Sequence, residues 1–208
     1  MDDRIIIKIK RKKELAGLSD AAIKKSLDKV LEKYKISQKN LTSQDEKIIV
    51  KEVRKDLRKI SGMFQSGAKN RKKFLQDEDF GALLKSHPST YERMSFYPEL
   101  KKIFSELGVK SVLDLGCGLN PMALADKNLF YFACDINENE LKILKSFFEK
   151  NNLRGKIFHY DLRDLSKPLP RADICLVFKV LDLIPNRIKT TRHLLEKINS
   201  RYLLASFS

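Results

Sequence analysis

The spacing of apolar residues changes along the chain and divides it into two regions. Up to about residue 80, apolar residues recur every three or four positions, which is typical of amphipathic helices. From Lys110 onward, short apolar runs alternate with helical patterns, which indicates an open parallel sheet with helices on both faces. We therefore predict a helical domain at 1–80 and an α/β domain at 81–208, with the boundary within 66–85.

Two helices are predicted in the first region. One begins at Ser19 or Asp20, and its apolar face holds Ile23, Leu27, Val30, Leu31 and Tyr34. The second begins at Ser43, with Glu46 completing a capping box, and ends at Gly62. Its apolar face holds Ile49, Val53, Leu57 and Ile60. The opening segment 1–14 has only a three-residue apolar run, so it does not read as a signal peptide.

The second region predicts five strands. They span 110–116, 130–136, 156–162, the start of 172–184, and 201–208. Helices are predicted at 137–153, with Asn137 as the cap, and across 186–200.

Composition points to a polyanionic partner. The 208 residues carry a net charge of +15, and residues 1–80 hold 22 basic against 13 acidic residues. A lysine-rich, solvated surface would explain the same charge. No apolar run approaches the ~20 residues of a membrane span. Cys117, Cys134 and Cys175 stand apart from one another and from the three histidines, so we predict no metal site, reduced thiols and a cytoplasmic location. We also expect a monomer.

The segment Asp114-Leu-Gly116-Cys-Gly118 follows a predicted strand. Glycines there let the backbone turn sharply and approach a ligand closely. A dinucleotide site would want a third glycine where Pro121 stands, and no Gly-Lys-Ser/Thr follows for a phosphate-binding loop. The loop therefore fits neither a dinucleotide fingerprint nor a phosphate-binding loop.

Acidic residues follow the next two predicted strands. Asp135, with Ile136 beside it, ends the second strand, and Asp161 with Leu162 ends the third. This layout is typical of the class I (Rossmann-like) S-adenosylmethionine (SAM) methyltransferase fold. In that interpretation the glycine loop, with Asp114, Gly116 and Gly118, faces the methionine end of SAM. Asp135 and Ile136 then face the ribose, and Asp161 and Leu162 the adenine. The alternative is a doubly wound sheet whose site is vestigial.

Three segments are more specific than the glycine pair. "HPSTYER" (87–93), "DLGCGLNPMALA" (114–125) and "LVFKVLDLI" (176–184) resemble the aminoglycoside-resistance 16S rRNA methyltransferase family (the Arm type). The helical "VRKDLRKISGMF" (53–64) is similar to the N-terminal domain of the same family, so the resemblance covers about residues 30–208.

The resemblance implies methyl transfer from SAM to N7 of a decoding-site guanine in 16S rRNA of the small ribosomal subunit. It implies that Arg93 pairs with the methionine carboxylate, that Asp135 holds the ribose, and that Lys179 lies near the target base. It also implies a basic N-terminal domain that docks on the subunit. The basic residues that we expect to contact phosphates are Lys55, Arg58, Lys59, Arg71, Lys72 and Lys73.

The chain departs from the family where it ends. It stops at Ser208, directly after the fifth predicted strand, where family members continue. We therefore expect the sheet to lack its last strands. This departure keeps two alternatives open: an RNA-binding module with the methyltransferase fold but little or no turnover, and methylation of another RNA position.

Overall fold

The computed structural model describes residues 2–37, 41–61, 65, 70–184 and 187–207. The chain forms two compact units, Met1–Gln65 and Ser66–Ser208. The division lies at the start of the expected boundary interval and before residue 80, where we had drawn it. Below, each unit is described by itself.

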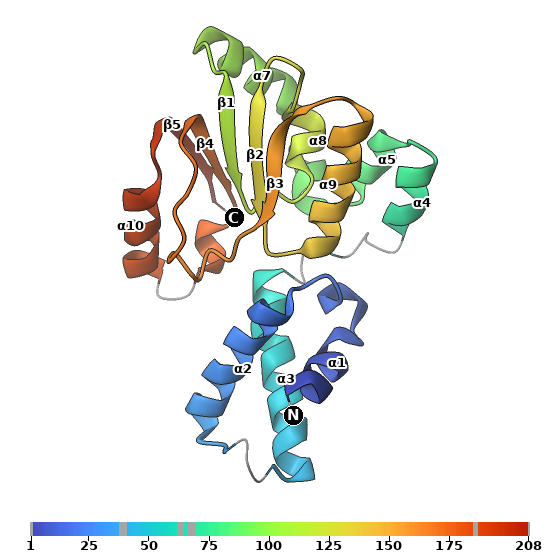
Figure 1. The fold of residues 1–208 in the computed structure, drawn as a ribbon, viewed down its shortest axis with the longest axis vertical. Coiled ribbons are helices and arrows are strands. Elements are labelled where there is room, and N and C mark those ends of the chain that lie inside the picture. The colour runs from blue at the N-terminus through green and yellow to red at the C-terminus, as the bar shows by residue number, and fades with distance from the viewer. Residues whose placement is uncertain (1, 38–40, 62–64, 66–69, 185–186, 208) are drawn as a thin grey trace. The chain divides into compact units, whose positions relative to one another are not determined.

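The first unit is helical, as predicted (Figure 1). Its elements are α1 (Asp2–Lys10), the 3-10 turn η1 (Lys13–Leu15), α2 (Asp20–Tyr34) and α3 (Ser43–Ile60). Ser19 caps α2, because its hydroxyl accepts a hydrogen bond from Ala22 N at 3.1 Å. The predicted apolar faces are buried except at Ile60, which is half-buried, and at Tyr34, which is 40% exposed. The predicted helix end at Gly62 lies outside the described residues.

Helix α1 was not predicted. Its residues Ile5, Ile6 and Ile9 are buried, while Ile7 is 60% exposed. This spacing places three isoleucines on one face of a short helix. Because the segment offers only nine helical residues and no cap signal, its pattern alone did not distinguish it from a charged tail.

The N-cap of helix α3 lies one residue before the predicted cap. Thr42, and not Ser43, is the N-cap: its hydroxyl accepts from Asp45 N at 3.1 Å, and the Asp45 carboxylate accepts from Thr42 N at 3.0 Å. Glu46, which we had placed in the capping box, instead forms an ion pair with Lys8 of α1. Both sequence pairs satisfy the capping-box spacing, so only the structure distinguishes them.

The second unit is a five-stranded, fully parallel sheet, as predicted, with strand order β3-β2-β1-β4-β5. The strands are β1 (Ser111–Leu115), β2 (Phe130–Asp135), β3 (Arg154–His159), β4 (Ala172–Phe178) and β5 (Ser200–Ser206). The helices are α4 (Arg71–Gln76), α5 (Phe80–Lys85), α6 (Pro88–Glu92), α7 (Tyr97–Glu106), α8 (Asn120–Leu124), α9 (Glu138–Lys150) and α10 (Arg187–Lys197), with the 3-10 turn η5 (Leu181–Leu183) between β4 and α10. Strand β3 starts and ends earlier than predicted, so Asp161 lies in the loop beyond it.

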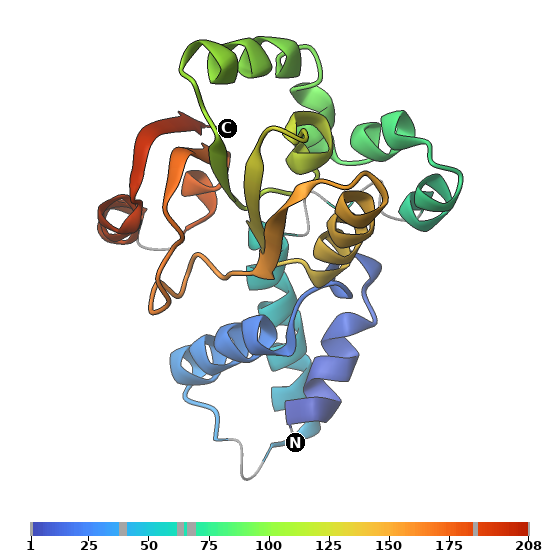
Figure 2. The same cartoon turned by 45° about the horizontal axis from the view of Figure 1, so that its top comes forward.

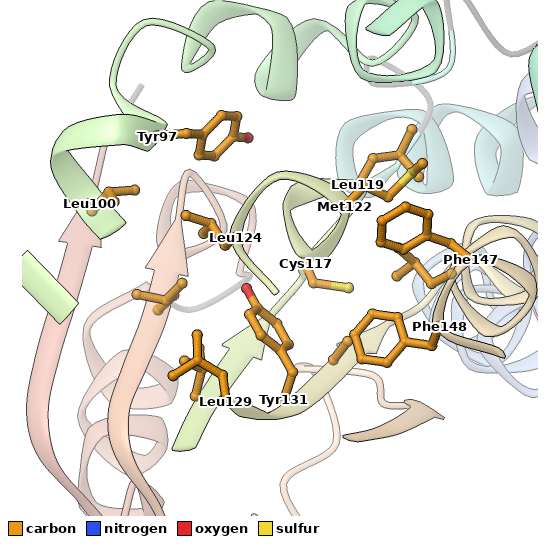
Figure 3. Packing of buried hydrophobic residues seen from close by; sticks show 14 of the residues in the cluster. Tyr97, Leu100, Cys117, Leu119, Met122, Leu124, Leu129, Tyr131, Phe147 and Phe148 are labelled. Atoms are coloured by element: carbon orange, nitrogen blue, oxygen red, sulfur yellow. The ribbon is translucent and has the colours of Figure 1, made fainter. Parts of the chain in front are cut away.

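Helices cover both faces of this sheet, and each face has its own core (Figures 1 and 2). Alternate residues of β1 point to opposite faces: Val112 belongs to the core shared with α7, α8 and α9, and Leu113 to the core shared with α10. The first core holds Tyr97, Leu124, Tyr131, Phe147 and Phe148, among others (Figure 3). The described residues include no helix long and apolar enough to cross a membrane.

The segment after the boundary packs on the first of these cores, which explains why it joins the second unit. Phe74 and Leu75 of α4, with Phe80 of α5, pack against the core, and Leu83 is fully buried in it. The Phe80 ring meets the Phe147 ring edge-on at a centroid distance of 5.0 Å. We had placed the domain boundary within 66–85, but the apolar residues of α4 and α5 anchor this segment to the sheet domain.

The capping geometry of α3 gives a test. We expect Thr42→Ala to lower the free energy of unfolding of the first unit by about 1 kcal/mol, because Asp45 N loses its hydroxyl acceptor and the Asp45 carboxylate loses its hydrogen bond from that hydroxyl. The matched control is Ser43→Ala, an exposed first-turn position whose hydroxyl is not the cap. Urea unfolding followed by circular dichroism measures both. Equal losses for the two variants would contradict this assignment.

Candidate functional site

The strand order brings three loops together at the carboxyl edge of the sheet. Strand β1 lies between β2 and β4, so the ends of these three strands adjoin one another. The order reverses at β1, and such a reversal leaves a crevice at the carboxyl ends of the strands. The predicted glycine loop follows β1, Asp135 is the last residue of β2, and Lys179 follows β4.

Both predicted glycines are required by the backbone and by space. Gly116 has φ +64° and Gly118 has φ +50°, conformations that other residues rarely adopt. A Cβ at Gly116 would come within 2.4 Å of Val180 Cγ1. A Cβ at Gly118 would come within 2.7 Å of His87 Cε1. The loop therefore passes between two side chains with no room for a third.

Asp135 ties this loop to strand β2. Its Oδ2 accepts from Gly118 N at 3.0 Å, and its Oδ1 accepts from Asn137 N at 2.9 Å. Burial and the nearby Glu140 charge raise its pKa to about 6, although the two backbone hydrogen bonds act in the opposite direction. Ile136 beside it is half-buried.

Arg93 lies in a polar cluster that the sequence analysis did not assemble. Its Nη2 donates to Asn120 Oδ1 at 3.0 Å, and the Tyr97 hydroxyl donates to the same oxygen at 2.8 Å. The guanidinium lies 5.0 Å from the centre of the Phe178 ring. Among the described residues, its buried Nε and Nη1 have no hydrogen-bond partner. Nη2 lies between these two donors, so each is left to make its own hydrogen bond, and buried guanidinium donors without partners suit an anion such as a carboxylate.

Asp114 lies beside this cluster and is fully buried. The Tyr131 hydroxyl donates to its Oδ2 at 2.8 Å, while Oδ1 has no partner in the described part of the chain. Burial raises its pKa to about 7, against the lowering effects of Tyr131 and Arg93. Tyr97, Asn120, Tyr131 and Phe178 thus complete a site that we had predicted only from Arg93 and Asp114. Asn120 was visible in the Gly-Leu-Asn-Pro motif, but the tyrosines looked like ordinary core residues.

Lys179 directly follows Phe178 at the end of β4. It has φ +57°, which a lysine rarely adopts, and its backbone N–H donates to Ser206 O at 2.9 Å. Its ammonium pairs with Glu92 of α6. Residues in sparsely populated backbone conformations cluster at functional sites.

Asp161 and Leu162 lie beyond β3. The Asp161 carboxylate accepts two hydrogen bonds from the Arg163 guanidinium, Nε to Oδ1 at 2.9 Å and Nη2 to Oδ2 at 2.7 Å. Leu162 is half-buried against the core shared with α10. The backbone N–H of the neighbouring Tyr160 donates to Asp135 O at 3.1 Å, so the loop that leaves β3 begins beside the end of β2.

One predicted phosphate contact is wrong. Arg71 is only 3% exposed, and its Nη1 donates to Glu140 Oε1 at 2.7 Å inside the second unit. It therefore cannot reach a phosphate, whereas Lys72 and Lys73 next to it are exposed on α4. Sequence reasoning missed this because a buried arginine within "NRKK" looks like its neighbours.

The first unit carries two basic grooves. One, of about 680 Å³, lies over α1 and α3 and is lined by Arg4, Lys8, Lys12, Ser43, Glu46, Lys47, Val50, Lys51, Arg54 and Arg58. The other, of about 200 Å³, lies over α2 and α3 and is lined by Lys29, Val30, Lys33, Tyr34, Glu52, Lys55, Asp56 and Lys59. Of the predicted residues, exposed Lys55 and Lys59 line the second groove. Arg58 lines the first and pairs with Glu14 at 2.9 Å.

The three cysteines are core residues of the second unit. Cys117, Cys134 and Cys175 are free and buried, and burial raises the pKa of each thiol. Figure 3 shows Cys117 packed in the core with Phe147 and Phe148. No group of three metal-ligating side chains occurs among the residues that the structure describes.

Comparisons with known proteins agree with this geometry. The chain is 30% identical over 134 residues to a 16S rRNA (guanine(1405)-N(7))-methyltransferase of Serratia marcescens, covering 62% of this chain and 52% of the relative. It is 28% identical over 131 residues to a protein of the same name from Frankia casuarinae, covering 60% of this chain and 46% of the relative. The chain thus spans about half the length of these curated relatives.

A solved structure shares the fold. The 16S rRNA methylase RmtB superposes with a TM-score of 0.81 at 23% identity, covering 100% of this chain and 84% of that chain. The family model described as "Ribosomal RNA methyltransferase (FmrO)" matches residues 57–208. Because that match includes all five strands and the whole carboxyl-edge site, the chain belongs to the ribosomal RNA methyltransferase (FmrO) family.

Proposed function

We propose that the protein is a SAM-dependent methyltransferase that modifies N7 of a guanine in 16S rRNA of the small ribosomal subunit, and that it thereby confers aminoglycoside resistance. The observation that carries the cofactor assignment is Arg93, whose buried Nε and Nη1 donors have no partner among the described residues and whose Nη2 donates to Asn120, two residues after Gly118. The names of the two curated relatives support the substrate and the target atom. The cytoplasm is where such a substrate would be met.

The residues present fit SAM from one end to the other. Arg93 would bind the methionine carboxylate, and Asp114 with Asn120 would face the methionine amino group, since Asp114 Oδ1 is a buried acceptor without a partner among the described residues. The glycine loop would leave room for the methionine part of SAM, and Asp135 and Ile136 would lie at the ribose. Asp161 and Leu162 would flank the adenine.

Methyl transfer to guanine N7 does not require a strong general base. Bound SAM supplies an electrophilic methyl group on a sulfonium. Guanine N7 has a lone pair and no proton, so the N–C bond forms as the C–S bond breaks and no proton has to leave. Catalysis then depends on holding the base in line with the methyl group. Lys179, fixed by its backbone bond to Ser206 and its pair with Glu92, would lie beside that base.

The proposed function has a direct test. The protein is incubated with small ribosomal subunits and SAM, and the rRNA is then cleaved chemically at N7-methylguanine and mapped by primer extension. A new stop at one guanine supports the proposal, and a stop elsewhere would indicate another RNA position. Saturable SAM and subunit binding without any methyl transfer would instead favour the RNA-binding module.

Arg93 gives the first prediction from this assignment. We expect Arg93→Ala to weaken SAM binding roughly 100-fold, because charge-assisted hydrogen bonding of a buried guanidinium to a carboxylate is worth about 3 kcal/mol. Arg93→Lys keeps the charge but not the fork, so its affinity should fall in between. Lys102→Ala, exposed on α7, is the control. Titration calorimetry measures all three, and an unchanged affinity in Arg93→Ala removes this role.

The groove over α1 and α3 gives the second prediction, which concerns binding to the small subunit. Replacing exposed Lys12, Lys47 and Lys51 by alanine should weaken binding to small subunits about tenfold near 0.1 M salt. It should also reduce the dependence of log K on log salt by about two units, because fewer counterions are released. The control replaces exposed Lys101, Lys110 and Lys127 of the second unit. Equal effects of the two triple variants would show that charge alone, and not the groove, drives binding.

A further inference from the structure

A chain of buried contacts runs from the helices before the sheet to the glycine loop. Arg71 of α4 and Glu140 of α9 are 3% and 2% exposed, and their side chains meet at 2.7 Å. Arg71 also donates to Ser86 twice, from Nε to Oγ at 2.9 Å and from Nη2 to the carbonyl at 3.0 Å. Ser86 directly precedes His87, so this one arginine joins α9 to the turn that leads into α6.

His87 is the next link. Its Nδ1 accepts from Thr90 N at 3.3 Å, which caps α6 and leaves the proton on Nε2. That nitrogen lies 3.6 Å from the same Glu140 oxygen that Arg71 binds. Burial, with the charges of Arg71 and Arg93, lowers the pKa of His87 to about 3, so the ring is neutral at physiological pH. Glu140 therefore faces a cation on one side and a neutral N–H on the other.

The ring of His87 lies directly against the glycine loop. A Cβ added to Gly118 would come within 2.7 Å of Cε1 and 2.8 Å of Nε2, so the ring fills the space that this glycine leaves. On its other side, Gly118 N donates to Asp135. The position of the loop is thus bounded by His87 on one side and by the Asp135 carboxylate on the other.

We propose that Glu140, held by Arg71, is a positioning residue for the cofactor: it fixes His87 against Gly118 and places the loop and Asp135 to receive the ribose of SAM. This inference rests on the proposed function. It assigns to Arg71 a role in SAM binding in place of the RNA contact that its neighbours in the sequence suggested.

The same arrangement affects the charge of Asp135. The titratable groups that face its carboxylate are Glu140 of α9, His87 at the N-cap of α6, Asp114 of β1, and the thiols of Cys117 and Cys134. Glu140 is the strongest of these and raises the Asp135 pKa, which lies at about 6. An ionised Asp135 is the better acceptor for ribose hydroxyls. Binding of SAM should therefore weaken as pH falls through about 6.

The decisive variant is E140Q. Glutamine keeps an oxygen for Arg71 and the shape of the side chain, so we expect SAM affinity at pH 7.5 to remain within about threefold of the wild type. It removes the negative charge, so the Asp135 pKa falls and the acid limb of binding moves to lower pH. A shift of half a unit makes E140Q bind about threefold more tightly than the wild type below the limb. Asp114 also titrates in this site, but the Glu140 charge is not among the main causes of its shift.

The anchoring role is tested with R71M. This variant removes the cation and the two contacts with Ser86, so we expect SAM to bind about tenfold more weakly at pH 7.5. R71K should recover part of that loss, and K72M, at the exposed neighbour on α4, should match the wild type. Calorimetric titration with SAM from pH 5 to 7.5, with thermal unfolding of each full-length variant, gives every value.

The outcomes distinguish a failure of the proposed function from a failure of this inference alone. A wild-type chain that binds no SAM at any pH overturns the proposed function and this inference with it. A wild-type chain that binds, with an E140Q acid limb that does not move or an R71M affinity that equals the wild type, overturns this inference alone. If R71M does not unfold cooperatively, the E140Q limb decides, because that variant retains the hydrogen bond to Arg71.

Discussion

The parallel direction of all five strands is the constraint on which the rest of the structure depends. Parallel strands end at one edge, and the reversal of strand order at β1 separates the loops that leave this edge. Residues as distant in sequence as Asp114 and Lys179 therefore lie at the same edge of the sheet. The tight approach of Val180 and His87 to the two glycines shows how little freedom the edge leaves to the loop between them.

The sequence predicted the sheet, and it also contains most of the residues proposed to bind the cofactor, because both follow from local patterns. Five apolar runs, two glycines and an acid after each of two strands are visible one segment at a time. What could not be predicted depends on contacts between segments. The cluster around Arg93 unites residues of α7, α8 and β4, and Tyr97 and Phe178 have no local feature that separates them from core residues. The same holds for α1, because its three buried isoleucines can be recognised as a packed face only when the helices that cover them are known.

Arg71 shows why residue type alone is a weak guide to electrostatics. It stands beside two exposed lysines, and all three carry the same formal charge. Only Arg71 is withdrawn from water, and a buried guanidinium requires a paired anion and satisfied N–H groups. Glu140 and Ser86 supply both. A basic run can therefore mix residues that attract a polyanion with residues that hold the fold together, and net charge overstates the surface available to RNA.

The two units divide the proposed work between different physical effects. Phosphate contacts through long lysine side chains tolerate imprecise geometry, because the attraction is long-ranged and weakens with salt. Methyl transfer to a lone pair has the opposite requirement, since its rate depends on alignment and not on a base. The structure matches this division. The first unit offers open basic grooves on three helices. The second fixes its site with buried hydrogen bonds, two constrained glycines and a lysine held in a rare backbone conformation. Rigidity is thus concentrated where the proposed chemistry needs it.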